Sequence, residues 1–292
     1  MDNARVDQGP DLAVTGSTGW LGGLVARDLA QRGVGQRLVV RAASRAPQLP
    51  GATVVECTYG EREAAERALT GVRTLLMVSA AEQEDRLTEH RTFVDAAAAA
   101  GVEHVVYLSF FGAAPQAAFT LARDHWATEE HLKASGMAWT FLRDNLYLEF
   151  MDQIVGDDGV IRGPAGDGRA AVVSHDDIAR VAVAVLLDPA PHTARTYDLT
   201  GPEALTFADM ASVISEVTGR VVTFHDETVE EAYASRAAYG APDWQVDAWV
   251  STYTAVRAGE LDGVSGDVER LTGRRPTSLR EHLLAGGSAG VS

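Results

Sequence analysis

The sequence has almost no cysteine, no excess of positive charge and no long apolar run, and each absence excludes a class of protein. Its 292 residues include one cysteine, so an internal disulfide is impossible and a cytoplasmic location is expected. Acidic residues outnumber basic ones by 41 to 25, and the net charge of −16 argues against partners with phosphate backbones or anionic membrane surfaces. The sequence shows no apolar segment of bilayer-crossing length and no secretory signal.

What is present is a regular alternation of apolar strands with helical segments that end at glycines. Hydrophobic residues form 46% of the chain, which suffices for one large domain or for a large domain with a small one. Strands are predicted at 12–15, 37–41, 54–57, 74–79, 104–109 and 138–143, and helices at 21–31, 61–69, 84–100 and 123–135. Repeated β-α-β units with nearly continuous apolar strands predict an α/β fold, a Rossmann-type doubly wound parallel sheet.

The pattern loosens after residue 150, which predicts a smaller, mostly helical lobe on the substrate side. A loop or hairpin is expected at 156–169, a helix at 178–187 and a strand at 196–200 that returns to the sheet. Further elements are a helix ending at Thr218, a short strand at 221–225 and helices up to Leu284. The predicted division is a Rossmann domain over 11–150 with 171–200 returning to it, a lobe from 151–170 and 201–285, and flexible tails at 1–10 and 286–292.

A glycine-rich turn joins the first strand to the first helix. It reads Gly16-Ser17-Thr18-Gly19-Trp20-Leu21-Gly22. Gly16 would let the chain leave the strand sharply, Gly19 would let the backbone approach a pyrophosphate, and Gly22 would allow close packing of helix on strand. Free amides at the helix start favour an anion. The alternative is a purely structural turn, but the strand–turn–helix context favours dinucleotide binding.

The end of the second strand indicates which dinucleotide is bound. An acidic residue there commonly holds the ribose 2′-hydroxyl of NAD. This chain instead has Arg41, with Ser44 and Arg45 close behind, and cations with a hydroxyl match a 2′-phosphate. The alternative is a solvated basic loop. The prediction is therefore NADP(H) in preference, with NAD(H) as a possible cofactor.

Several separated motifs stand out along the chain: TGSTGWLG at 15–22, VVR at 39–41, LLMVSA at 75–80, HVVYLS at 104–109, FLRDNLYLE at 141–149, HDDIARVAVAVL at 175–186 and YDLTGPEALTF at 197–207. Together they resemble the NmrA-like branch of the atypical short-chain dehydrogenases, nearest to its type 2 NAD(P)H:quinone oxidoreductases.

The resemblance implies roles for matching positions. Residues 16–21 would hold the pyrophosphate, Arg41 the 2′-phosphate, and Ser79 and Ala80 would line the riboses. Asn145 would lie close to the nicotinamide. Thr58 stands at the adenine contact, where the family often has an aspartate, which puts that contact in doubt.

The usual catalytic pair of short-chain dehydrogenases is missing. Those enzymes use Tyr-x-x-x-Lys, with the tyrosine as acid. By spacing, His125 replaces the lysine and Leu121 the tyrosine. The catalytic candidates are therefore His125 and, as the resemblance implies, Asn145. His125 and Glu129, four residues apart, share one face of a helix. His125 either bonds the nicotinamide ribose or the substrate, or is a helix-surface histidine paired with Glu129; the sequence leaves both open.

Aromatic side chains near the expected strand ends are candidates for substrate contact. Phe110 and Phe111 follow the fifth strand, where ligands bind in such sheets, and Tyr147 follows the sixth. All three could equally be core residues. The sequence Ser174-His175-Asp176-Asp177 opens a helix and is interpreted as a cap rather than a metal site. Cys57 is interpreted as a small buried residue.

The leading functional hypothesis is an NADPH-dependent reductase of a quinone or similar conjugated carbonyl compound, acting as a monomer or homodimer on a small molecule. Two alternatives stay open. One is a non-catalytic NAD(P) sensor of the NmrA type that binds a partner protein, which the missing Tyr and Lys would permit. The other is a tailoring reductase of a ketone, enone or imine in secondary metabolism.

Overall fold

The computed structural model describes residues 9–151 and 153–286, which fall into two compact units. The first unit runs to residue 109 and includes 127–142 and 179–197; the second comprises 110–126, 143–178 and the chain from 198 onward. The tails predicted at 1–10 and 286–292 lie outside the described residues, except for Gly9, Pro10 and Gly286. No helix within the described ranges is long and apolar enough to cross a membrane.

The units do not follow the domain boundary predicted near residue 150. Segments 110–126 and 143–150 belong to the second unit, although their strand and helix patterns continue the Rossmann alternation. The reason lies in the core, because Phe110, Phe119 and Leu148 pack in the apolar cluster of the second unit. The hydrophobic periodicity of a segment indicates whether it is a helix or a strand. It does not indicate which of two apolar cores the end of that helix or strand packs into.

The central sheet has seven strands in the order β3-β2-β1-β4-β5-β6-β9. These are β1 (Leu12–Thr15), β2 (Gln36–Val40), β3 (Ala52–Glu56), β4 (Thr74–Met77), β5 (His104–Phe110), β6 (Ala138–Asp144) and β9 (Arg195–Leu199). The registers of β1 with β2 and β4, of β2 with β3, and of β4 with β5 are parallel. The strand order reverses between β1 and β4, which confirms the doubly wound fold and places its switch point there.

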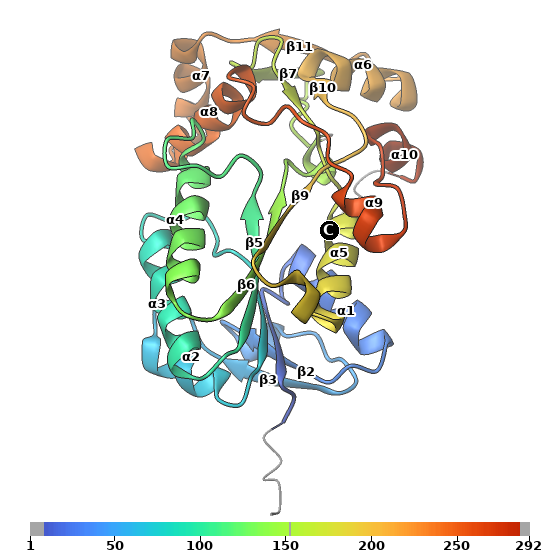
Figure 1. Ribbon diagram of the computed structural model, residues 1–292. Coiled ribbons are helices and arrows are strands. Elements are labelled where there is room, and N and C mark those ends of the chain that lie inside the picture. Colours follow the sequence, from blue (N-terminus) through green and yellow to red (C-terminus); the bar gives the residue numbers. More distant parts are fainter. Residues whose placement is uncertain (1–8, 152, 287–292) are drawn as a thin grey trace, which may run out of the picture. The chain divides into compact units, whose positions relative to one another are not determined.

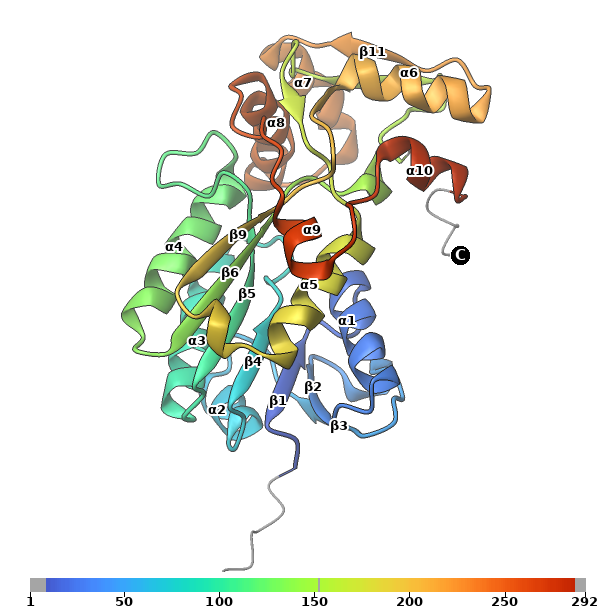
Figure 2. The same ribbon diagram turned by 45° about the vertical axis from the view of Figure 1, so that its right-hand side comes forward.

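Helices cover both faces of this sheet (Figures 1 and 2). One face carries α1 (Trp20–Gln31) and α5 (His175–Leu187), and the other carries α2 (Arg62–Leu69), α3 (Arg86–Ala99) and α4 (Thr120–Ala134). The core beneath α2 and α3 includes Phe93 and Tyr107, both fully buried. Cys57 lies in the same core, and burial raises the pKa of its thiol to about 11, which confirms its interpretation as a small buried residue.

The second unit is built from short strands and helices around its own core. Its elements are β7 (Val160–Gly163), β8 (Arg169–Ala170), β10 (Leu205–Thr206), α6 (Phe207–Thr218), β11 (Thr223–Asp226), α7 (Val229–Arg236), α8 (Asp243–Arg257), α9 (Asp267–Thr272) and α10 (Leu279–Leu284). The hairpin alternative for 156–169 is wrong. β7 pairs in parallel with β11, and β8 pairs antiparallel with β10, so both partners lie far along the chain where local pattern could not indicate them.

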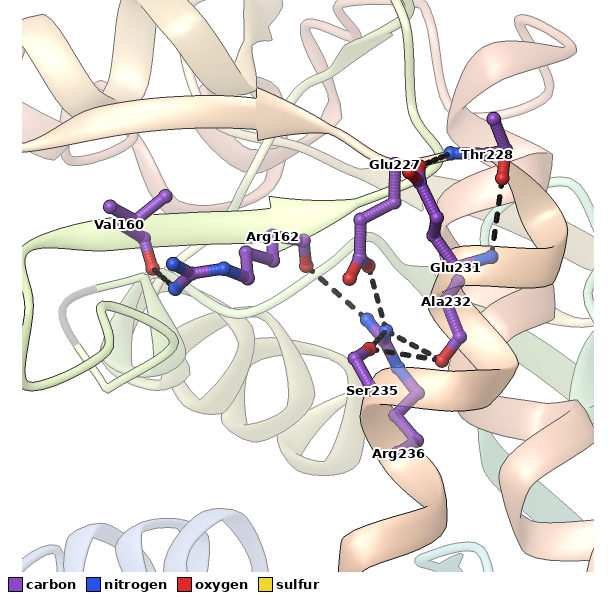
Figure 3. Close-up of polar contacts among 8 residues, drawn as sticks. All are labelled: Val160, Arg162, Glu227, Thr228, Glu231, Ala232, Ser235 and Arg236. Atoms are coloured by element: carbon purple, nitrogen blue, oxygen red, sulfur yellow. Dashed lines mark hydrogen bonds and ion pairs between the residues drawn. The ribbon is translucent and has the colours of Figure 1, made fainter.

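A buried ion pair joins α7 to β7 and to the segment that precedes α7 (Figure 3). The Arg236 guanidinium donates to Glu227 Oε2 at 2.9 Å and to the Ala232 and Arg162 carbonyl oxygens at 3.0 and 3.2 Å. It also lies over the Tyr253 ring, 5.3 Å from its centroid. Since both charged side chains are buried, each is the principal counter-charge of the other.

Candidate functional site

The glycine turn after β1 is as close-packed as its composition predicts. Gly16 has a φ of +67°, and a Cβ there would lie 2.9 Å from the Cβ of Val78. A Cβ on Gly22 would lie 2.5 Å from the Gly16 carbonyl and 2.7 Å from the Thr15 oxygen. Gly22 therefore excludes a side chain because backbone already occupies the space, and Gly16 does so because of its positive φ and the Val78 side chain. Gly19 differs: its φ is −98°, and a Cβ would meet only the Gly16 oxygen, at 3.4 Å.

The start of α1 has the features of an anion site. Gly19 is the N-cap residue, and no side chain caps the helix. The Ser17 hydroxyl is buried and has no hydrogen-bond partner in the part of the chain that the structure describes. Buried hydroxyls in proteins nearly always have a partner, and uncapped helix starts leave backbone donors unsatisfied. A phosphate would satisfy both, so this corner fits the diphosphate of a dinucleotide.

The other residues of the turn contribute unequally. Thr18 is half-buried, and the Trp20 side chain is about half exposed. Leu21 is buried in the protein, so only its backbone is available to a ligand. The sequence could assign these positions to the turn but not separate backbone from side-chain roles.

The segment after β4 lies against this turn. The Val78 amide donates to Thr15 Oγ1 at 2.9 Å, and the Tyr59 hydroxyl lies 2.6 Å from both the Val78 carbonyl oxygen and Thr15 Oγ1. Burial raises the pKa of Tyr59, so the hydroxyl stays protonated. Two residues on, the Ala80 amide donates to His90 Nε2 at 2.8 Å. Sequence patterns singled out Ser79 and Ala80 but missed the side chains that hold this segment.

The end of β2 presents the predicted cations to solvent. Arg41 and Arg45 are exposed, as is Ser44, and neither guanidinium has an ion-pair partner among residues 9–151 and 153–286. The loop is held from β3, where Glu56 Oε2 accepts the Ala43 amide at 2.9 Å. No local pattern selects Glu56, because its proximity to this loop follows from the register of β2 with β3.

Thr58, at the expected adenine contact, is engaged within the protein. Its amide and its hydroxyl both donate to Glu61 Oε2, at 3.3 and 2.8 Å. The side chain is thereby fixed at the start of α2. An adenine contact at this position stays a prediction.

In the second unit, His125 and Phe110 lie together. Phe110 is in the apolar core, edge-to-face with Phe119 at 5.0 Å, and the His125 ring lies 6.1 Å from the Phe110 ring. His125 is buried, so its interpretation as a helix-surface residue is wrong. Glu129 belongs to the first unit and is also buried, with its carboxylate accepting a 2.6 Å hydrogen bond from Ser109. The face of α4 that carries these side chains points into the protein.

The end of β6 places three candidate groups next to one another. Asn145 is fully buried; its Oδ1 accepts the Leu146 amide at 2.8 Å and its Nδ2 donates to the Leu261 carbonyl at 3.1 Å. The Tyr147 hydroxyl donates to Asp144 Oδ2 at 3.1 Å. Burial raises the pKa of Asp144 well above its usual range, which favours the neutral carboxylic acid. Sequence reasoning missed Asp144, because nothing in the pattern distinguishes a buried acid at a strand end.

The remaining aromatic candidate, Phe111, is half-buried beside the same core. Its backbone amide donates to the Asp144 carbonyl at 2.8 Å, and its ring lies close to Gly263. Phe111 and Tyr147 thus retain exposed ring surface, whereas Phe110 has little.

The start of α5 is a cap, as predicted. Ser174 Oγ accepts the Asp177 amide at 3.1 Å and donates to Asp177 Oδ2 at 2.6 Å. The same carboxylate oxygen accepts the Thr277 amide at 2.8 Å, so the cap also anchors a distant loop. His175 lies beside Glu149, with 3.2 Å between Nδ1 and Oε2, and burial lowers the pKa of its imidazole.

A doubly wound sheet with an uncapped, glycine-rich helix start at its switch point defines a Rossmann-type α/β protein. The sequence comparison gives the family. The NmrA-like family model matches residues 10–244, and the chain belongs to that family.

Relatives of known activity match over nearly their whole length. Quinone oxidoreductase 2 of Escherichia coli is 32% identical over 93% of this chain and 97% of its own. The NAD(P)H azoreductase of Xenophilus azovorans is 30% identical over 95% and 98%. Among solved structures, the NADPH complex of the E. coli quinone oxidoreductase superposes with a TM-score of 0.85, at 31% identity, over 93% of this chain and 98% of that one.

Proposed function

We propose that this protein is an NAD(P)H-dependent reductase that prefers NADPH and transfers hydride to a quinone or similar conjugated carbonyl compound. The observation that carries the proposal is the corner at Gly16, Ser17 and Gly19, where an uncapped helix start meets a buried hydroxyl without a partner. The relatives support it, because a quinone oxidoreductase and an azoreductase both match almost end to end.

The cofactor would be held by groups of the first unit. The diphosphate would lie on the amides of residues 16–21 and the Ser17 hydroxyl. Arg41 and Arg45, exposed and without ion-pair partners among the described residues, would face the 2′-phosphate together with Ser44. Ser79 and Ala80 would line the riboses, and Thr58 the adenine. When bound, the reduced nicotinamide supplies a hydride.

The residues of the second unit would serve the reacting end. His125 and Asn145 are proposed to lie at the nicotinamide. Asn145 would act through its backbone carbonyl, since its side-chain amide is engaged by Leu146 and Leu261 and its backbone amide donates to the Leu199 carbonyl at 3.1 Å. Phe111 and Tyr147 would contact a flat acceptor, with Phe110 as the buried support behind them. In this arrangement the protein provides orientation and excludes water.

The class of hydride acceptor follows from the absence of the tyrosine that donates a proton in ordinary short-chain dehydrogenases. The tyrosine position of ordinary short-chain dehydrogenases is Leu121, which packs against the apolar core and carries no proton to donate. Hydride transfer to a quinone needs less acid assistance than reduction of a simple ketone, because the phenolate product is stabilised by conjugation. An electron-poor conjugated acceptor is therefore the class that this chain can reduce without that tyrosine.

The test is turnover with a matched binding control. Purified protein, NADPH and a panel of small quinones are followed at the absorbance band of the reduced nicotinamide. The proposal expects quinone-dependent loss of that band, faster with NADPH than with NADH, and none with G19A. Tight NADPH binding without turnover on any quinone would overturn the reductase assignment and favour a dinucleotide sensor.

A further inference from the structure

The segment from Val78 to Ala80 is held on both sides of its middle residue. Val78 is bonded through its amide to Thr15 and through its carbonyl to Tyr59. Ala80 is bonded through its amide to His90 Nε2 at 2.8 Å and through its carbonyl to Arg86 Nε at 3.0 Å. Four side-chain contacts thus hold the backbone amides and carbonyls of two residues that lie outside regular secondary structure.

Ser79, between them, makes no hydrogen bond through its amide, carbonyl or hydroxyl to any described residue. It is half-buried rather than exposed. Backbone groups at such depth ordinarily have partners in the protein or in a ligand. The four contacts to Val78 and Ala80, together called the clamp, hold Ser79 at the carboxyl end of β4 beside the switch point. The hydrogen-bonding groups of Ser79 itself are not used by any described residue.

His90 is a neutral acceptor in this arrangement. It is fully buried on α3, and its two nitrogens have different partners: Nε2 faces the Ala80 amide and Nδ1 lies 2.9 Å from Thr128 Oγ1. An amide can only donate, so Nε2 carries no proton and Nδ1 carries it. Burial and the nearby Arg86 guanidinium lower the pKa of the imidazole well below its usual range, which keeps this tautomer at neutral pH.

The clamp also contacts the glycine turn, because Val78 packs against Gly16. The space where a Gly16 Cβ would stand is filled by Val78, at 2.9 to 3.1 Å. Tyr59, whose hydroxyl bonds the Val78 carbonyl, stacks its ring on Phe93 of α3 with 4.1 Å between centroids. Phe93 lies three residues, about one helical turn, after His90. A shift of the 78–80 segment would therefore move the wall of the turn as well.

We propose that His90 and Arg86 are positioning residues for the dinucleotide. By bonding the amide and the carbonyl of Ala80, they orient the neighbouring Ser79 to bond a ribose hydroxyl of the cofactor. The inference rests on the proposed function but adds residues that do not touch the ligand. Because the clamp is formed before binding, its loss removes preorganisation and weakens affinity rather than the chemical step.

The test compares H90F, H90Q and H104F by calorimetric titration with NADPH. Phenylalanine fills the space without an acceptor, whereas glutamine can return an oxygen to the Ala80 amide. His104 is the matched control, since it is also buried and bonded to a threonine hydroxyl, 2.8 Å from Thr140 Oγ1, but holds no part of the segment after β4. H90F is expected to weaken NADPH about tenfold, since a buried donor loses its acceptor, with H90Q recovering most of the loss and H104F unchanged.

Turnover at saturating NADPH should stay close to the wild-type value in H90F, which separates positioning from chemistry. A second measurement needs no variant: nitrogen NMR of the ligand-free protein should show the Nδ1-protonated tautomer of His90 and a slowly exchanging Ala80 amide. H90F and H104F with equal, wild-type affinity would overturn the inference, as would an Nε2-protonated His90. Wild-type protein that binds no NADPH would instead refute the proposed function, so the two failures are distinguishable.

Discussion

The start of α1 in the first unit and the Arg236–Glu227 cluster in the second unit differ in whether their buried polar groups have hydrogen-bond partners. At the start of α1, the Ser17 hydroxyl is buried with no partner and the helix has no cap. In the second unit, the Arg236 guanidinium is saturated by Glu227 and by backbone oxygens. Unsatisfied groups are retained where a ligand completes them, and satisfied ones where they hold the fold.

This contrast separates two consequences of mutation. Changes at the open corner of the first unit should alter affinity for the dinucleotide more than the free energy of unfolding. Changes in the closed cluster of the second unit should do the reverse. The four predictions below test that separation.

The largest expected effect is on stability, from R236M. The change removes the counter-charge of Glu227, which is itself buried, so unfolding should become easier by about 3 to 5 kcal/mol. Urea unfolding measures it. The control is R280M, whose ion pair with Glu216 is exposed and should be worth less than about 1 kcal/mol. The R236M protein that remains folded should bind NADPH with unchanged affinity. A loss of NADPH affinity alongside the loss of stability would contradict the separation of the two effects.

Two glycines of the turn should split cleanly into structure and binding. G22A puts a Cβ into the Gly16 carbonyl and should destabilise the fold by about 3 kcal/mol. G19A meets only ordinary contact and should keep the wild-type melting temperature while weakening NADPH on the order of a hundredfold, because its methyl group occupies the space of the diphosphate. Thermal unfolding and calorimetric titration measure the pair. A G19A protein with full affinity would mean that the diphosphate lies elsewhere.

A smaller, selective effect is expected at the end of β2. Arg41→Asp replaces an exposed cation with an anion at the proposed 2′-phosphate. NADPH should bind about tenfold or more weakly, while NADH, which has no such phosphate, should be nearly unaffected. Titrations with both dinucleotides measure the ratio. Equal losses for the two would contradict the preference for NADPH.

The smallest expected effect is the pH dependence carried by Asp144. Its folded pKa is raised by burial, so the unfolded chain releases its proton first, and this group lowers stability as pH rises above the ordinary aspartate value toward the folded pKa. D144N has no carboxyl group to titrate at this position. The stability of the variant relative to wild type should therefore rise from pH 5 to pH 7. Urea unfolding at both values measures the gain; a constant difference would show that Asp144 is ionised in the folded protein.

The sequence predicted the first half of the fold because its information is local. Apolar strands, glycine stops and the turn at residues 16–22 each lie within one short window, so β1 to β6 and the switch point follow from periodicity and handedness. The same information failed at 156–169, where β7 and β8 pair with strands some 35 to 65 residues away. No local pattern indicates a partner at that distance.

The sequence indicated the close packing of the glycine turn but not the side chains that surround the candidate site. Gly16 and Gly22 each meet a steric requirement of the turn, whereas the role of Gly19 at a diphosphate stays a prediction. His90, Tyr59 and Asp144 were missed, because a histidine on a helix or an acid at a strand end looks solvent-exposed in sequence. Their burial follows from tertiary packing, as it does for His125.

The most direct measurement is a crystal structure of the protein with NADPH. The account predicts the diphosphate within hydrogen-bond distance of the α1 amides and of Ser17 Oγ, which would then gain the partner it lacks. A dinucleotide bound elsewhere, with Ser17 still unbonded and the turn occupied by protein side chains, would contradict it.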